Sequence, residues 1–245
     1  MSGWLAVYGR EMLLMQKKIG KLGYVFSSVM FPVIYLFAFG LGLGSRLEVS
    51  GGYVPFLATG IASLTVMLNA FQQTSLSVSA GRLYFHTFQT VFLSPVPPLQ
   101  VVGGIALAGI TRGLIMGGLV YAVAWLAFGV PPLSGIAVTA LLLSAFCFSA
   151  LGIVLGLAIA DPDEISLVNN FLITPMIFFC GSFFPVQNLP VALQAVVSIL
   201  PLSMANSLVR LTAWNGHAAG QAAALALMGL GLLLWGAGSL KKYSE

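Results

Sequence analysis

Long apolar stretches recur along the whole of this 245-residue sequence, and charged residues rarely interrupt them. A helix of about 20 apolar residues is long enough to cross the hydrocarbon core of a bilayer, which is ~30 Å thick. Hydrophobic residues make up 59% of the chain and charged residues 7%, whereas soluble domains carry about 25% charged residues. So few charges could not cover the surface of a soluble fold. The sequence therefore predicts an all-α polytopic membrane protein.

Six of these stretches are long enough to be transmembrane helices. The expected spans are residues 24–44, 54–76, 100–128, 133–159, 165–184 and 218–240. Basic residues concentrate on the cytoplasmic side of membrane proteins. If the N-terminus is cytoplasmic, that side holds Arg10, Lys17, Lys18, Lys21, Arg82, Lys241 and Lys242. Only Arg46 and Arg210 then lie outside, so we expect both termini in the cytoplasm, in agreement with an even number of spans.

Residues 4–22 are expected to form an interfacial helix that does not cross the membrane. One helical stripe of this segment holds Trp4, Tyr8, Met12, Met15, Ile19 and Leu22. Its basic residues lie off that stripe. A basic amphipathic helix of this kind turns its charges toward anionic headgroups. A disordered N-terminal tail is the alternative interpretation.

Residues 77–98 contain too many polar residues and prolines to cross the membrane. Within them, residues 81–95 are predicted to form a short amphipathic helix on the cytoplasmic side, which Gly81 starts and Pro95 stops. The residues that we assign to its docking surface are Gly81, Arg82, Tyr84, Phe85, His86, Thr87, Phe88, Gln89 and Phe92. We interpret the segment as a coupling helix for a cytosolic partner. An interfacial helix that only connects two spans is the alternative.

The segment 185–216, on the outer side, contains two apolar pieces, 191–200 and 202–211, which Pro201 separates. A helix of ten residues is ~15 Å long, about half the thickness of a bilayer core. The pattern favours a re-entrant helical hairpin that enters the membrane from outside and packs against the spans, because only protein or water can satisfy an irregular backbone at that depth. A helix that lies flat on the outer surface is the alternative.

A few polar residues fall inside the expected spans. Arg112 lies near the middle of the third span, where an arginine costs ~2.5–3.5 kcal/mol on insertion scales. It could contact an anionic substrate, pair with a carboxylate, or extend toward the interface. Asn169 and Asn170 open the fifth span, where they line a pathway or form hydrogen bonds between helices. All acidic residues, Glu11 included, are expected at edges or in loops, which argues against an intramembrane enzyme.

Glycines spaced four residues apart occur in two of the expected spans. Gly113 and Gly117 form one pair, and Gly152 and Gly156 form another. Because a glycine has no side chain, such pairs let two membrane helices approach closely. We therefore expect these two faces to pack against other helices, although glycine is common throughout this sequence.

Two stretches carry a resemblance to a known family. Residues 173–190 read ITPMIFFCGSFFPVQNLP, and residues 81–98 read GRLYFHTFQTVFLSPVPP. Together with Arg10 and Glu11 before a basic amphipathic stretch, they resemble the permease subunits of type-2 ABC transporters that export drugs, lipo-oligosaccharides and polysaccharides. The resemblance covers essentially the whole chain. Its fifth-span and hairpin residues here are Thr174, Pro175, Gly181, Phe184, Pro185, Leu189, Pro190 and Pro201.

One difference from the family concerns the coupling helix. Many members carry several acidic residues there, whereas this chain has none between Gly81 and Pro98. Aromatic and polar residues take their places, which looks more like the nodulation-factor exporters. The difference affects the individual docking contacts that we expect.

The resemblance implies half of an ATP-driven exporter in a bacterial inner membrane. Two permease copies would pair as a homodimer, with two cytosolic ABC ATPase subunits that bind ATP and Mg. This chain contains no G-x-x-x-x-G-K-[ST] sequence, so it cannot hold nucleotide phosphates in a P-loop. We expect no catalysis, no cofactor and no nucleic acid at this chain, only membrane lipids and these subunits. The substrate would be amphipathic, such as a lipid-linked saccharide or a drug. A secondary transporter or channel is the alternative.

Overall fold

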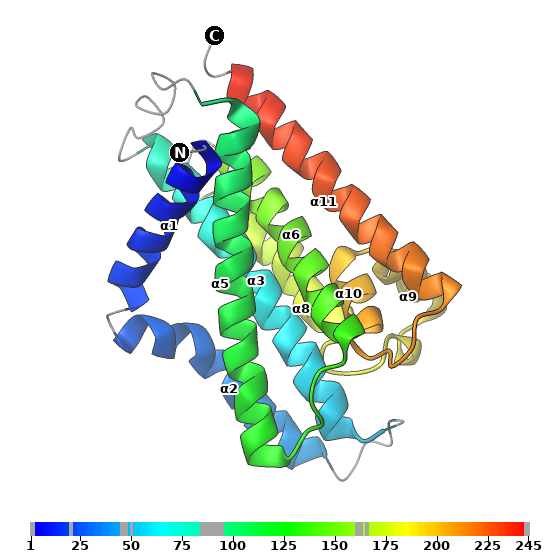
Figure 1. Ribbon diagram of the computed structural model, residues 1–245. Coiled ribbons are helices and arrows are strands. Elements are labelled where there is room, and N and C mark those ends of the chain that lie inside the picture. Colours follow the sequence, from blue (N-terminus) through cyan, green and yellow to red (C-terminus); the bar gives the residue numbers. More distant parts are fainter. Residues whose placement is uncertain are drawn as a thin grey trace.

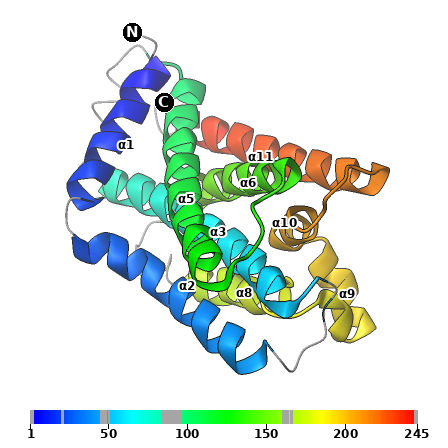
Figure 2. The ribbon, with the colours of Figure 1, turned by 60° about the horizontal axis from the view of Figure 1, so that its bottom comes forward.

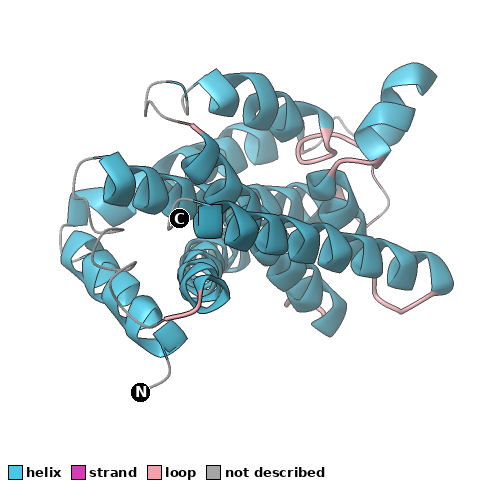
Figure 3. Cartoon of the chain, turned by 90° about the horizontal axis from the view of Figure 1, so that it is seen from above, coloured by secondary structure: helices cyan, strands magenta, loops and turns pink. Residues whose placement is uncertain are grey.

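The computed structural model describes residues 3–19, 22–44, 49, 51–83, 96–159, 164 and 167–242. Helices and loops make up this part of the chain, with no strand in the described ranges (Figure 3). The all-α fold is therefore confirmed. Helix α1 begins and helix α11 finishes at the same end of the molecule (Figure 1). We call this the termini end, and the other the opposite end.

Helix α3 (Tyr53–Leu83) forms the core of the molecule. It packs along both α5 (Pro98–Phe128) and α6 (Gly135–Ala158) (Figures 1 and 2). The glycine pairs allow this packing. A Cβ atom at Gly113 of α5 would lie 2.8 Å from the Val66 carbonyl oxygen, and one at Gly156 of α6 would lie 2.8 Å from that of Ser75. Both glycine faces therefore contact α3, as the spacing predicts.

Among the described residues, four helices are long and apolar enough to cross a membrane: α3, α5, α6 and α11 (Gly216–Lys242). A fifth span results if α9 (Val191–Ser198) and α10 (Pro201–Val209), which meet at an angle of 89°, are taken together. Helix α2 (Leu22–Leu43) corresponds to the first expected span. The apolar parts of α2 and of the expected fifth span are shorter, so the count of six spans stays a prediction.

Helix α3 continues to Leu83, past the expected end of the second span at residue 76. Its last turns contain Ser79 and Gly81, which do not belong to an apolar stretch. Both residues are buried. Helix α3 extends beyond its apolar part because it packs against α6 there. Gly81 therefore does not start the predicted coupling helix but lies in the last turns of α3. Residues 84–95, which make up the rest of that helix, lie outside the described residues.

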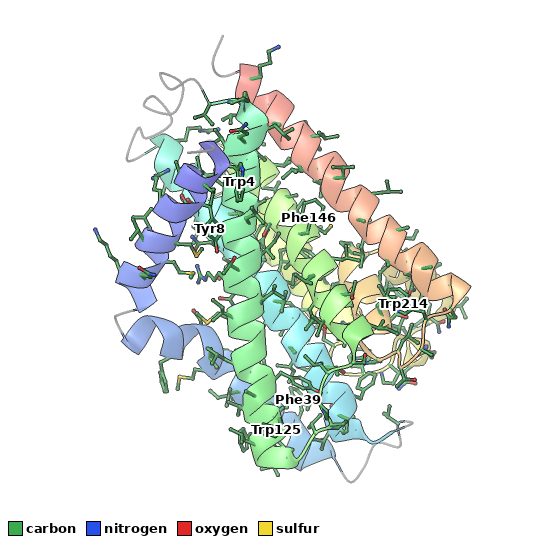
Figure 4. The ribbon with its side chains drawn as sticks, viewed as in Figure 1. Trp4, Tyr8, Phe39, Trp125, Phe146 and Trp214 are labelled. Carbon is green, nitrogen blue, oxygen red and sulfur yellow. The ribbon has the colours of Figure 1, made fainter. Side chains whose placement is uncertain are left out.

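Helix α1 (Gly3–Ile19) packs along the first half of α5. The backbone of Trp4 approaches α5 so closely that a Cβ atom at Gly104 would lie 2.8 Å from its carbonyl oxygen. The hydroxyl groups of Tyr8 and Thr111 are 3.2 Å apart, and Trp4 and Tyr8 lie between the two helices in Figure 4. The predicted stripe thus faces the bundle in part. The position of α1 at a membrane interface stays a prediction.

The segment between the expected fifth and sixth spans folds into two short helices, as the position of Pro201 indicates. Helix α10 buries Leu202, Ala205 and Leu208 against α3, α6 and α11. Helix α9 buries only Val197. The two halves of the hairpin therefore differ, because α10 belongs to the bundle and α9 covers its edge. Whether the hairpin enters a membrane stays a prediction.

Candidate functional site

The expected fifth span is divided in the structure. A π-helical turn, η1 (Asn169–Ile173), leads into the short helix α8 (Thr174–Phe179). Pro175 explains the π turn, because proline has no N–H to donate and its ring displaces the carbonyl four residues earlier. The Thr174 hydroxyl donates to the Asn169 carbonyl oxygen at 3.2 Å. Asn169 is partly buried and Asn170 is exposed.

Helix α8 ends at Phe179, so the helix that we expected over 165–184 is shorter than predicted. Gly181 causes this ending, because its φ of +79° is a left-handed conformation that glycine adopts without strain. The chain then forms a loop, residues 180–185, which contains the predicted residues Phe184 and Pro185. We call it the signature loop. It lies at the opposite end, where it contacts the start of α3.

Helix α3 holds the signature loop at two points. The Tyr53 hydroxyl donates a hydrogen bond of 3.0 Å to the Phe183 carbonyl oxygen. Two turns along α3, Gly60 leaves room for the loop, since a Cβ atom there would overlap the Ser182 carbonyl oxygen. The loop backbone therefore lies directly against α3.

Helix α10 and the residue after it hold the signature loop from the other side. The Asn206 Nδ2 atom donates to the Cys180 carbonyl oxygen at 2.8 Å. The Arg210 Nη2 atom donates to the Gly181 carbonyl oxygen at 2.7 Å and to that of Phe56, on α3, at 3.2 Å. The guanidinium also lies over the Phe56 ring, 3.6 Å from its centre. The loop is thus tied to α3 and α10 by polar side chains.

The other predicted residues of the hairpin are prolines and a leucine that shape the chain between helices. Pro185 immediately precedes the 3-10 turn η2 (Val186–Asn188), and Pro190 immediately precedes α9. Pro201 is the first residue of α10, a position that suits proline because the first helical N–H has no partner in the helix. Leu189 packs against the bundle core. These residues therefore determine where the short helices of the segment begin and how the chain packs between them.

A second polar cluster lies among α1, α3 and α5, and we call it the inner network (Glu11, Gln73, Ser77 and Arg112). The Arg112 Nη1 atom donates to Gln73 Oε1 at 2.5 Å. Gln73 Nε2 and the Ser77 hydroxyl donate to Glu11 Oε2 at 3.4 Å and 2.7 Å. Side chains from three helices thus form one chain of hydrogen bonds that joins a carboxylate to a guanidinium.

The inner network corrects the expectation that all acidic residues lie at edges or in loops. Glu11 is 1% exposed and Arg112 is 5% exposed, so Arg112 does not extend into water. Burial of charges is tolerated where they are hydrogen-bonded or paired. Gln73 links the two groups, and Glu11 also forms an ion pair of 3.7 Å with Arg10. The sequence carries the signal for Glu11, which lies three residues after Tyr8 and four before Met15 and so belongs to the face that α1 turns inward.

Arg82 connects two helices at the termini end. Its Nη1 atom donates to the Leu157 carbonyl oxygen, and its Nη2 atom donates to that of Ile159 at 2.9 Å. These carbonyls belong to the end of α6, where backbone oxygens have no partner within the helix. Arg82 therefore fixes the end of α3 to the end of α6. The remaining predicted docking residues lie outside the described part of the chain: Tyr84, Phe85, His86, Thr87, Phe88, Gln89 and Phe92.

Known proteins resemble this chain over most of its length. The sequence model of the ABC-2 type transporter matches residues 4–214, from α1 through the hairpin. The chain belongs to this family. It is 32% identical over 219 residues to nodulation protein J of Rhizobium leguminosarum bv. viciae, covering 85% of this chain and 81% of that protein. It is 30% identical over 173 residues to the inner membrane transport permease YadH of Escherichia coli (strain K12), covering 69% of this chain and 67% of that protein.

The chain is therefore a multi-pass membrane transport permease of the ABC-2 family, and the family implies an ABC ATPase subunit as its partner. Both polar clusters lie within the matched residues. Sequence reasoning missed Glu11, Gln73, Tyr53 and Asn206 as members of these clusters. Asn206 had a signal, because its carboxamide is the most polar side chain of the short helix Pro201–Val209. Tyr53 had none, since its partner is a backbone carbonyl far away in the sequence.

Proposed function

We propose that this permease is the membrane-spanning half of an ATP-driven exporter. It moves an amphipathic substrate, such as a lipid-linked saccharide or a drug, out of the cytoplasm. The observation that carries the proposal is the family match over residues 4–214, which includes every helix from α1 to α10. The 245 residues contain no P-loop sequence, so the ATP is hydrolysed on a separate subunit.

The proposed assembly contains two copies of this chain and two ATPase subunits in a bacterial inner membrane. The termini end faces the cytoplasm, α2 and the η1–α8 segment complete six spans, and the hairpin re-enters from outside. Basic residues on the cytoplasmic side support this orientation. Large apolar side chains of α2 are exposed, which supports a position of this helix beside lipid or a second copy. Phe26, Phe31 and Leu41 are each more than half exposed.

Coupling to the ATPase is proposed for residues 81–95, which begin within the last turn of α3. Because Arg82 binds the end of α6, a displacement of this segment would act on α3 and α6 together. Arg82→Glu would set a carboxylate against the α6 carbonyls and should reduce transport per ATP hydrolysed. Lys17→Glu, an exposed charge reversal on α1, is the control. Unchanged coupling in Arg82→Glu would remove Arg82 from this role.

The direct test is biochemical. The chain is purified alone and together with its ABC ATPase subunit, and ATP hydrolysis is measured in both preparations. We expect hydrolysis only in the complex, together with ATP-dependent movement of a fluorescent amphipath in proteoliposomes. Robust hydrolysis by the purified chain alone would contradict the assignment of the ATPase to another subunit.

A secondary transporter or channel is the second candidate. The burial of both Glu11 and Arg112 favours it, because ionisable residues inside a membrane domain often mark an ion pathway. Proteoliposomes that contain the permease without ATPase separate the two candidates. An ion or pH gradient should drive no transport in them, and transport at rates similar to those of the ATP-driven complex would favour the second candidate.

A further inference from the structure

A cavity of about 600 Å³ lies at the opposite end, between the signature loop, the α9–α10 hairpin and α11. Phe56 and Arg210 form part of its wall. Arg210 also lines a second cavity, of about 290 Å³, between the start of α3 and the turn from α5 to α6. The other polar side chains that reach the larger cavity include Gln187, Gln194, Ser198, Ser207 and Gln221. The larger cavity is thus a hydrogen-bonding site with one cation.

The positive charge of Arg210 has no counter-charge in the part of the chain that the structure describes. Its Nη2 atom donates to two neutral backbone carbonyls, and its Nε atom has no hydrogen-bond partner. Among the described residues, none that lines either cavity is acidic. A guanidinium that is partly removed from water without a carboxylate partner strongly favours an anion, which it binds with two parallel hydrogen bonds.

Two carboxamide oxygens in the cavity wall also lack partners. Asn206 is 1% exposed, and its Oδ1 atom has no hydrogen-bond donor. The Oε1 atom of Gln221, on α11, is buried without a donor as well. Buried polar atoms normally find partners, and a hydroxyl group is a donor of suitable size. A group that carries both an anion and hydroxyls would fit these atoms and Arg210 together.

The surface beside the cavity is apolar. Val196 and Ile199, on and directly after α9, are 61% and 67% exposed and lie outside the cavity wall. Residues of the same helix, Gln194 and Ser198, turn toward the cavity. One short helix therefore has a polar face toward the cavity and an apolar face away from it, as the headgroup and the acyl chains of a lipid-like molecule require.

We propose that this cavity binds the headgroup of an anionic amphipath in the outer leaflet. A phosphate or carboxylate lies against Arg210, hydroxyl groups donate to Asn206 and Gln221, and acyl chains lie along α9. The inference rests on the orientation proposed above, with this end outside, but it requires neither ATP nor export. The molecule is a resident phospholipid or the exported substrate, and both share this headgroup chemistry.

The test measures binding to the purified permease alone, so that failure of the export proposal does not affect it. Native mass spectrometry in detergent gives the dissociation constants of short-chain phosphatidylglycerol and short-chain phosphatidylcholine. Ala195→Phe fills the cavity from α9 and leaves the bonds of Arg210 in place. Ala192→Phe, exposed on the same helix and outside the cavity wall, is the matched control. Arg210→Gln removes the charge.

We expect the wild-type permease and Ala192→Phe to bind phosphatidylglycerol about tenfold more tightly than phosphatidylcholine, as one charge-assisted contact provides. Ala195→Phe and Arg210→Gln should lose this preference. Competition by glycerol phosphate would show that the headgroup alone is recognised, and the absence of competition would show that a lipid is required; both outcomes agree with the site. The proposal would be overturned if Ala195→Phe and Ala192→Phe preferred phosphatidylglycerol over phosphatidylcholine equally. It would also be overturned if the wild type showed no such preference.

Discussion

Arg112 and Arg210 lie in different parts of the same bundle and have opposite surroundings. Arg112 is buried among three helices, and Gln73 joins it to the carboxylate of Glu11. Arg210 lies after α10, binds the carbonyls of Gly181 and Phe56, and borders two cavities. The first arginine is compensated within the protein. The second retains a charge that a ligand can use.

The difference suggests a division of tasks between the interior of the bundle and its opposite end. The inner network ties α1 to α3 and α5, so it stabilises one arrangement of these helices. The contacts around Arg210 instead hold a loop that contains no regular helix and lies beside a cavity. Because that loop is held by individual hydrogen bonds, a few substitutions should loosen it without unfolding the bundle.

Substitution of Arg112 should have the largest effect on stability. Arg112→Leu leaves Gln73 Oε1 buried without its donor and leaves the partly exposed Arg10, 3.7 Å away, as the cation beside the Glu11 carboxylate. The loss of a charge from this buried network should cost about 3–5 kcal/mol in the free energy of unfolding. Thermal unfolding of the purified permease in detergent measures the change. Lys17→Gln, an exposed basic residue of α1, should change stability by less than about 0.5 kcal/mol.

The double substitution of Glu11 and Arg112 by leucine sharpens this prediction. The loss should be well below the sum of the two single losses, because residues of one network are energetically coupled. Additive losses would show that the two charges do not interact, and the inner network would lose its assigned role.

Gly60→Ala should have an intermediate effect, confined to the opposite end. The new methyl group overlaps the Ser182 carbonyl oxygen, and such overpacking costs about 1–3 kcal/mol. Because the signature loop must move away from α3, access of a thiol reagent to Cys180, which is buried in this loop, should increase. Gly118→Ala on α5 has open space around it and should leave stability and thiol access near wild type. Equal thiol access in the two variants would mean that α3 does not hold the loop.

Tyr53→Phe should have the smallest effect. It removes one hydrogen bond, to the Phe183 carbonyl oxygen, and should lower stability by about 1 kcal/mol. Tyr35→Phe, on α2 beside the Phe183 ring, keeps the aromatic packing and is the matched control, with no expected loss. A larger loss in Tyr35→Phe than in Tyr53→Phe would contradict the role of the hydroxyl at position 53.

The long helices could be predicted from the sequence because apolar length depends only on nearby residues. Residues 100–128 and 133–159 were expected to be helical, and α5 and α6 end within two residues of these bounds. The two failures had different causes. The fifth-span helix ends early for a local reason, because Gly181 adopts a left-handed conformation. Helix α3 extends past residue 76 for a non-local reason, because α6 lies beside it.

Most members of the polar clusters could not be predicted from the sequence either, because tertiary packing brings them together. Arg112 was recognised as unusual, but its connection to Glu11 depends on where α1 packs, which no local pattern states. The outer cavity needs the signature loop, the hairpin and α11 to come together. Only the tertiary structure places Arg210 at its wall.

The contrast between the two arginines is tested most directly by the melting temperatures of the wild type, Arg112→Gln and Arg210→Gln with added phosphatidylglycerol or phosphatidylcholine. Arg112→Gln should melt below the wild type in both lipids, yet phosphatidylglycerol should raise its melting temperature as much as that of the wild type. Arg210→Gln should lose this lipid-specific increase. An undiminished increase in Arg210→Gln, or its loss in Arg112→Gln, would contradict the assignment of an internal role to Arg112 and a ligand-binding role to Arg210.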